Sequence, residues 1–145
     1  MIKTVLISIF LLVLASTILT GDYTLNCLAA SDYKLTNSSY KGSYSGPYTV
    51  EAGIFGEQTG RFTLSIDEDG RVTGKAENHT TNRRADMNGS VNDDGDIKLL
   101  LEWSDATYTI KGTVTKTKSG HLKGTLNQYS GKSVIATITM DLSPR

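Results

Sequence analysis

The residues of this chain that are able to do metal or nucleophile chemistry are few and scattered. There are two histidines, His79 and His121, and one cysteine, Cys27. Neither histidine has a second histidine or a cysteine at ligand spacing, so a zinc site would need ligands from distant parts of the chain. The central residue of Gly42–Gly46 is tyrosine rather than the serine of a nucleophile elbow, and no His-Glu-x-x-His or phosphate-cradling glycine motif occurs. The sequence therefore predicts a protein that is not an enzyme and holds no metal or cofactor. A hydrolase built from converging Asp, Glu and His side chains stays as an alternative, because perturbed carboxylate pairs are invisible in a sequence.

Two acidic segments, 67–70 (DEDG) and 92–96 (NDDGD), raise the question of a calcium loop. A loop of the helix-loop-helix kind needs a bidentate glutamate at its twelfth position. Counted from Asp67, that position is Asn78, so the ligand is missing. Asp-Gly pairs between alternating strands are instead typical of hairpin turns, where glycine adopts a positive φ without steric cost. We expect both segments to be turns.

Tyrosines form the densest group of residues suited to recognition. Tyr40, Tyr44 and Tyr48 are each four residues apart, with Tyr33 upstream. An even spacing within a strand places side chains on one face. These tyrosines either cover one end of a closed sheet or form an exposed contact surface, since tyrosine is favoured at protein interfaces.

The elements that must position these residues are strands, because apolar residues alternate and no window shows a helical period. In the first clear hairpin, Phe62, Leu64 and Ile66 share one face, and the same alternation recurs to the end of the chain. The first inward set runs to Ile54 and the last begins at Val134. Short turns between about eight strands require antiparallel neighbours. The residues that this pattern places in the interior include Phe62, Leu99, Leu101, Trp103, Ile110 and Ile138.

Glycines lie in or beside most of these strands. Interior glycine permits the sharp coiling that a closed sheet needs. We therefore expect an all-β fold, a single antiparallel up-and-down meander of about eight strands closed into a barrel. An open two-layer sandwich is the alternative. Lys116 continues the inward parity of Val114, so the strand must reach the rim there or a bulge must change its register.

The start of the chain indicates export. A basic start precedes Thr4–Thr20, a charge-free apolar run typical of a secretory signal peptide and near the lower length limit of a membrane-spanning helix. Residues 1–29 are interpreted as a signal peptide or an uncleaved anchor, residues 30–41 as a polar tether and residues 42–145 as the barrel domain. Membrane association is expected only if the leader stays uncleaved or Cys27 is lipidated, and the residues before Cys27 match a lipidation signal poorly. The expected location is secreted, or the periplasm and cell envelope.

The charge balance excludes one class of partner. The chain has 15 basic and 15 acidic side chains, whereas a nucleic-acid-binding protein needs a cationic surface. A single cysteine also excludes a disulfide scaffold.

At the level of pattern, residues 42–142 resemble the small Gly- and Thr-rich meander barrels of bacterial exported proteins and surface lipoproteins. The resemblance lies in strands such as Gly112–Val114 and turns such as Asn92–Gly95. Lipocalins and biotin-binding barrels fit less well, because the only tryptophan is Trp103. We expect a non-enzymatic binding protein that acts by protein–protein contact or inhibition, with an unknown protein as its partner. The alternative is a carrier of a small apolar ligand inside the barrel.

Overall fold

The computed structural model describes residues 38–51, 54 and 56–145. The expected signal segment, Cys27, Tyr33 and the tether up to residue 37 lie outside this range. No helix in the part of the chain that the structure describes is long and apolar enough to cross a membrane.

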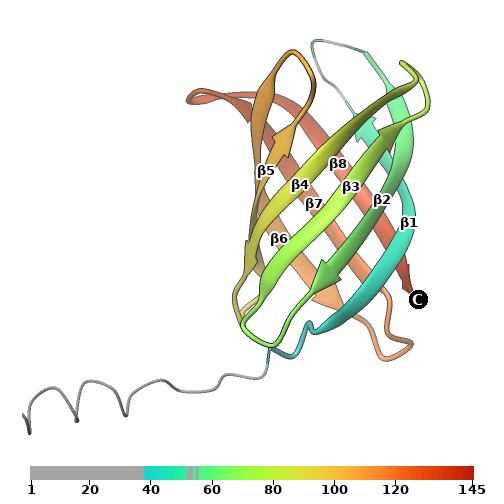
Figure 1. Cartoon of the computed structure of the whole chain (residues 1–145), viewed down its shortest axis with the longest axis vertical. Helices are drawn as coiled ribbons and strands as arrows, with labels where there is room; N and C mark the ends of the chain where they lie inside the picture. The colour runs from blue at the N-terminus through green and yellow to red at the C-terminus, as the bar shows by residue number, and fades with distance from the viewer. Residues whose placement is uncertain (1–37, 52–53, 55) are drawn as a thin grey trace, which may run out of the picture. The chain divides into compact units, whose positions relative to one another are not determined.

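The fold is a closed barrel of eight antiparallel strands in sequence order (Figure 1). The expected up-and-down meander is confirmed, and the open sandwich is wrong because the last strand pairs with the first, with Tyr48 opposite Met140. The strands are β1 (Gly42–Glu51), β2 (Gln58–Ile66), β3 (Arg71–Asn78), β4 (Arg83–Val91), β5 (Asp96–Glu102), β6 (Thr107–Lys116), β7 (Leu122–Ser130) and β8 (Ser133–Pro144).

The interior of the barrel is filled by the inward residues of every strand. Each strand alternates buried and exposed positions, as in β5, where Ile97, Leu99 and Leu101 point inward. Burial of one such side chain contributes roughly 1.5–3 kcal/mol. The core is thus built by the two-residue period, with at most 3% exposure at the interior positions Phe62, Leu99, Leu101, Ile110 and Ile138.

Glycines allow the strands to coil tightly enough to close. A Cβ added at Gly89 would lie 2.0 Å from the carbonyl oxygen of Lys98, and one at Gly74 would lie 2.2 Å from that of Thr63. Any side chain there would push neighbouring strands apart, so these positions require glycine. Close approaches to a neighbouring strand's carbonyl also occur at Gly46, Gly60, Gly112 and Gly124.

The acidic segments form hairpin turns. Asp67 Oδ1 accepts hydrogen bonds from the backbone N–H groups of Asp69 and Arg71, both at 2.9 Å. Gly70 completes the turn with a φ of +76°. The second acidic turn uses the same device, in which Asn92 Oδ1 accepts from the Asp96 N–H at 2.8 Å. The polar side chains at these positions therefore stabilise the turns by accepting hydrogen bonds from backbone N–H groups.

One end of the barrel, the closed end, is covered by residues 38–41. The hydroxyl of Tyr40 donates to the Val114 carbonyl at 3.3 Å, and the Ser38 N–H donates to the Glu68 carbonyl at 2.9 Å. Lys116, whose inward parity was a conflict in the sequence, ends β6 at this rim and donates through Nζ to the Ser39 and Lys41 carbonyls. Residues 38–41, which the sequence analysis placed in the polar tether, pack on the barrel through these contacts.

Two residues expected inside the barrel lie outside it. Ile54 is 74% exposed because β1 ends at Glu51, and Val134 is 52% exposed. Tyr129 pairs with Val134 while its neighbour Gln128 pairs with Ala136. This bulge places one extra residue in β8 and reverses the parity on one side of it.

Candidate binding site

The opposite end of the barrel, here called the open end, contains a cavity of about 140 Å³. Its lining residues come from the end of the barrel that has the β3–β4, β5–β6 and β7–β8 turns, the upper end in Figure 1. Its lining residues are Tyr48, Val50, Gln58, Phe62, Asn78, Thr81, Arg83, Leu101, Trp103, Tyr108, Gln128 and Ile138. Larger hollows of about 460–770 Å³ lie along the outer wall, among outward Ser, Thr and Lys side chains open to solvent.

The three described tyrosines of the expected contact surface are all inside the barrel. Tyr40, Tyr44 and Tyr48 are 8%, 1% and 4% exposed. An exposed contact surface is therefore wrong for these three residues, because the even spacing directs them all to the inner face. Tyr40 and Tyr44 cover the closed end, whereas Tyr48 reaches the cavity.

The hydroxyl groups of these tyrosines have different surroundings. Tyr44 donates to the Tyr40 carbonyl at 2.7 Å, and Tyr40 donates to Val114. Tyr48 stacks on Phe62 at 4.1 Å between ring centroids. Its hydroxyl has no hydrogen-bond partner among the residues that the structure describes. Burial raises the pKa of Tyr48 to about 12, because the phenolate loses hydration there.

Two buried amide side chains also line the cavity, and only one of them forms side-chain hydrogen bonds to other described residues. Asn78 donates through Nδ2 to Gln58 Oε1 at 2.6 Å, and its Oδ1 accepts from the Thr81 N–H at 3.0 Å. Gln128 is 8% exposed and its side chain has no partner within the described chain. None of the described buried side-chain polar atoms is both sealed from solvent and unpaired. The Gln128 amide therefore faces the open space of the cavity.

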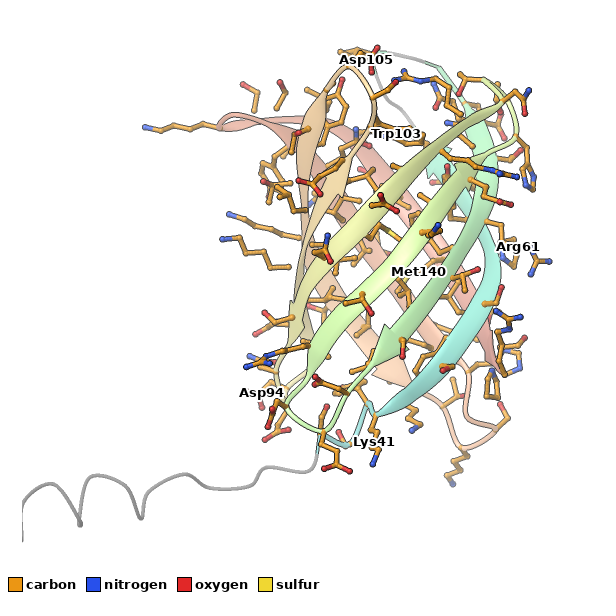
Figure 2. All side chains as sticks on the ribbon, viewed as in Figure 1. Lys41, Arg61, Asp94, Trp103, Asp105 and Met140 are labelled. Atoms are coloured by element: carbon orange, nitrogen blue, oxygen red, sulfur yellow. The ribbon has the colours of Figure 1, made fainter. Side chains whose placement is uncertain are left out.

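Trp103 forms one wall of the open end. It follows the last residue of β5 and packs half-buried against the core, so it lies at the rim rather than in the barrel centre. The Arg83 guanidinium lies 5.1 Å above its ring and forms an ion pair with Asp105. Figure 2 shows Trp103 and Asp105 at the end opposite Lys41 and Asp94.

The rim of the open end also carries exposed apolar side chains. The Ile54 N–H donates to the Ile135 carbonyl at 3.2 Å, which ties the β1–β2 loop to the β8 bulge. Ile54 and Val134 are therefore attached to neighbouring parts of the rim, and both are largely exposed. Leu100 is the remaining exposed large hydrophobic residue of the described chain, and it lies on the outer face of β5.

A group of titratable side chains lies on the outer wall of the barrel. Asp141 on the outer wall accepts from Lys123 Nζ and contacts His121 Nδ1, each at 2.8 Å. These two contacts, Lys123 first, hold the pKa of the Asp141 carboxyl below its usual range. Within residues 38–51, 54 and 56–145, no group of three or more His, Cys, Asp or Glu side chains is placed to hold a metal ion.

The structure brings together some of the residues singled out in the sequence and adds others. Phe62, Leu101, Trp103 and Ile138 line the cavity, while Leu99 and Ile110 lie deeper in the core. Sequence reasoning missed the polar lining, above all Gln128. Its signal was present, because position 128 continues the inward parity of Leu122, Gly124 and Leu126 with a polar side chain.

No protein-family model matches the chain, and no curated protein or solved structure matches it either. The class of the protein is therefore defined by its fold, a closed eight-stranded up-and-down barrel with residues 38–41 covering one end.

Proposed function

We propose that this protein is an exported, non-enzymatic binding protein that acts by contact with, or inhibition of, another protein at the cell envelope or outside the cell. The open end is the proposed contact surface. The observation that carries the proposal is the exposure of Ile54 (74%) and Val134 (52%) on the same rim as half-buried Trp103.

The two ends of the barrel differ in a way that supports this assignment. The closed end is covered by the protein's own residues 38–41, and its turns are rich in charge. The open end combines apolar rim residues with a small central cavity. Protein interfaces commonly have aromatic and apolar anchors around a desolvated centre, with polar groups outside it. Export rests on the leader-like run Thr4–Thr20.

Site-specific photocrosslinking tests the proposal. A photoreactive amino acid is placed at Val134 on the open end and, as a matched control, at Ser119 in a turn at the closed end. The proteins are expressed in the native host. A single protein should crosslink from position 134 and not from 119, and the isolated partner should bind the purified full chain.

The binding must also depend on the rim. Ile54→Lys and Val134→Lys should each weaken partner binding, by about tenfold for one buried apolar anchor, whereas Ser119→Lys should not. Equal crosslinking from both ends, or binding that both rim substitutions leave unchanged, would refute the open end as the contact surface.

Carriage of a small apolar ligand is the second candidate, and the apolar part of the cavity lining favours it. The volume speaks against a large cargo, because pockets for drug-sized ligands usually measure about 300–1,000 Å³ and this one measures about 140 Å³. Mass spectrometry of organic extracts from the natively expressed protein distinguishes the two candidates. A carrier would yield one stoichiometric small molecule that a cavity-filling Val50→Phe variant loses.

A further inference from the structure

We infer that the cavity at the open end binds a single neutral aromatic ring that carries one hydrogen-bonding group, as in a phenol. The inference deepens the proposed function and rests on it only insofar as the ring belongs to a partner protein. The same chemistry is offered by a tyrosine side chain or by a free phenol, and the experiment below separates these two sources.

The size of the cavity selects one ring. A protein cavity of about 150 Å³ lined by apolar side chains accommodates benzene, and this cavity measures about 140 Å³. Its walls include the stacked rings of Tyr48 and Phe62, and the side chains of Trp103 and Tyr108. Aromatic walls favour a planar occupant, since offset or edge-to-face ring pairs add about 0.5–1.5 kcal/mol beyond simple burial.

The polar groups of the cavity select a ring with a hydrogen-bonding substituent. Tyr48 and Gln128 are both at least nine-tenths buried as residues, and neither the hydroxyl nor the amide has a hydrogen-bond partner in the part of the chain that the structure describes. A carboxamide offers both donors and an acceptor, and a tyrosine hydroxyl offers one of each. A phenol hydroxyl in the cavity would therefore find partners of either kind.

Of the two buried amides in the cavity lining, Gln128 is the one whose side chain has no hydrogen-bond partner in the described chain. Asn78 uses both ends of its amide within the protein, toward Gln58 and Thr81. Asn78 thus stabilises the β3–β4 turn, while Gln128 projects from the inner face of β7 and has no side-chain hydrogen bond to any described residue. An occupant of the cavity displaces the solvent from these groups, so one that replaces the lost hydrogen bonds binds more tightly than one that cannot.

The charge of the cavity selects a neutral occupant. Arg83 is the only ionic side chain among the described residues that line the cavity. Its charge is matched by Asp105 and it lies on the Trp103 ring. No carboxylate occurs among the lining residues that the structure describes, so nothing in this set attracts a cation.

Binding is measured by titrating the full chain with p-cresol and with toluene, which has the same ring without the hydroxyl. Trp103 is the only tryptophan, so its fluorescence reports directly on the open end. We expect p-cresol to change this fluorescence with a Kd of about 1 mM, as small fragments do, and toluene to bind about 3–10-fold more weakly. Protonated benzylamine and benzoate should bind more weakly than p-cresol.

Matched variants on one strand test the role of the amide. Gln128→Leu should weaken p-cresol about 3–10-fold and leave toluene unchanged or tighter, in line with the loss of one hydrogen bond. Asn127→Leu, on the outer face of β7, should alter neither. The inference is overturned if p-cresol and toluene bind equally to the wild type, if neither binds, or if Gln128→Leu leaves the preference for p-cresol intact.

Titration with N-acetyl-tyrosinamide separates the two sources of the ring. Binding at least as tight as that of p-cresol assigns the ring to a polypeptide, whereas much weaker binding assigns it to a free small molecule. The failure of this inference is distinguishable from that of the proposed function. If a partner crosslinks at position 134 but p-cresol does not bind, only the inferred ring site is refuted. If p-cresol binds but no partner crosslinks, only the proposed protein contact is refuted.

Discussion

Replacing each of three tyrosines by phenylalanine should separate structural hydroxyl groups from an available one. The three residues share a spacing of four and an inward face, yet their hydroxyl groups differ. Tyr44 donates to a buried carbonyl at 2.7 Å, Tyr40 donates at 3.3 Å, and Tyr48 has no partner in the described part of the chain. The substitution removes one oxygen atom and keeps the ring, so packing changes little.

The expected magnitudes follow from these contacts. A buried hydrogen bond contributes about 0.5–1.5 kcal/mol net, and leaving its partner unpaired adds to the loss. Tyr44→Phe should therefore lower the free energy of unfolding by about 1–2 kcal/mol, and Tyr40→Phe by about 0.5 kcal/mol because its bond is longer. Tyr48→Phe should change it by less than about 0.5 kcal/mol or stabilise the protein, since no intramolecular bond is lost.

Equilibrium unfolding in urea measures these differences. For a chain of this size, Tyr44→Phe should move the midpoint down by about 1 M, with an unchanged slope. Tyr48→Phe should leave the midpoint near that of the wild type or above it. If Tyr48→Phe costs as much as Tyr44→Phe, its hydroxyl has a strong partner in the folded protein, and the reasoning about the cavity is refuted.

Three further predictions concern other parts of the barrel. Gly60→Ala should destabilise the protein by about 1–3 kcal/mol, because its Cβ would lie 2.1 Å from the Glu77 carbonyl oxygen. Thermal melting measures this loss, and a melting temperature equal to that of the control variant Thr59→Ala would contradict it. Gln128→Leu should leave the free energy of unfolding equal or higher, because an apolar side chain of similar size replaces a buried amide that has no partner in the described chain; a loss above about 1 kcal/mol in urea would contradict it. The lowered pKa of Asp141 means that the folded state favours the carboxylate, so its stabilising effect is present above the ordinary aspartate pKa and is lost as the pH falls through the lower folded value. The unfolding free energy of Asp141→Asn should therefore depend less on pH in this acidic range than that of the wild type, and identical pH profiles would exclude the effect.

Much of the fold could be predicted from the sequence because the inward period is nearly unbroken. Phe62, Leu64 and Ile66 already fix one face of β2, and the Asp67–Gly70 turn fixes its antiparallel partner. Closure was predictable from glycines such as Gly89, where the neighbouring strand leaves no room for a Cβ. These features are local, and local rules describe them well.

The residues that the sequence misplaced depend on non-local events. Val134 has the parity of the core, but a bulge opposite Tyr129 turns it outward. Ile54 continues the parity of Val50, yet the strand ends before it. The Tyr40 hydroxyl at the closed end reaches the carbonyl of Val114, which belongs to a strand distant in the sequence. Such contacts join residues far apart in the chain, so spacing alone cannot reveal them.

The pairing of β8 with β1 restricts how any other polypeptide can associate with this barrel. An open sheet offers a row of unpaired backbone N–H and C=O groups at its edge, to which a foreign strand can add. Here the ladder runs around the whole described sheet and returns to its start. Recognition by strand addition would require that hydrogen-bond ladder to be broken first. A partner of the intact barrel must therefore bind through side chains rather than by pairing with the backbone of a strand.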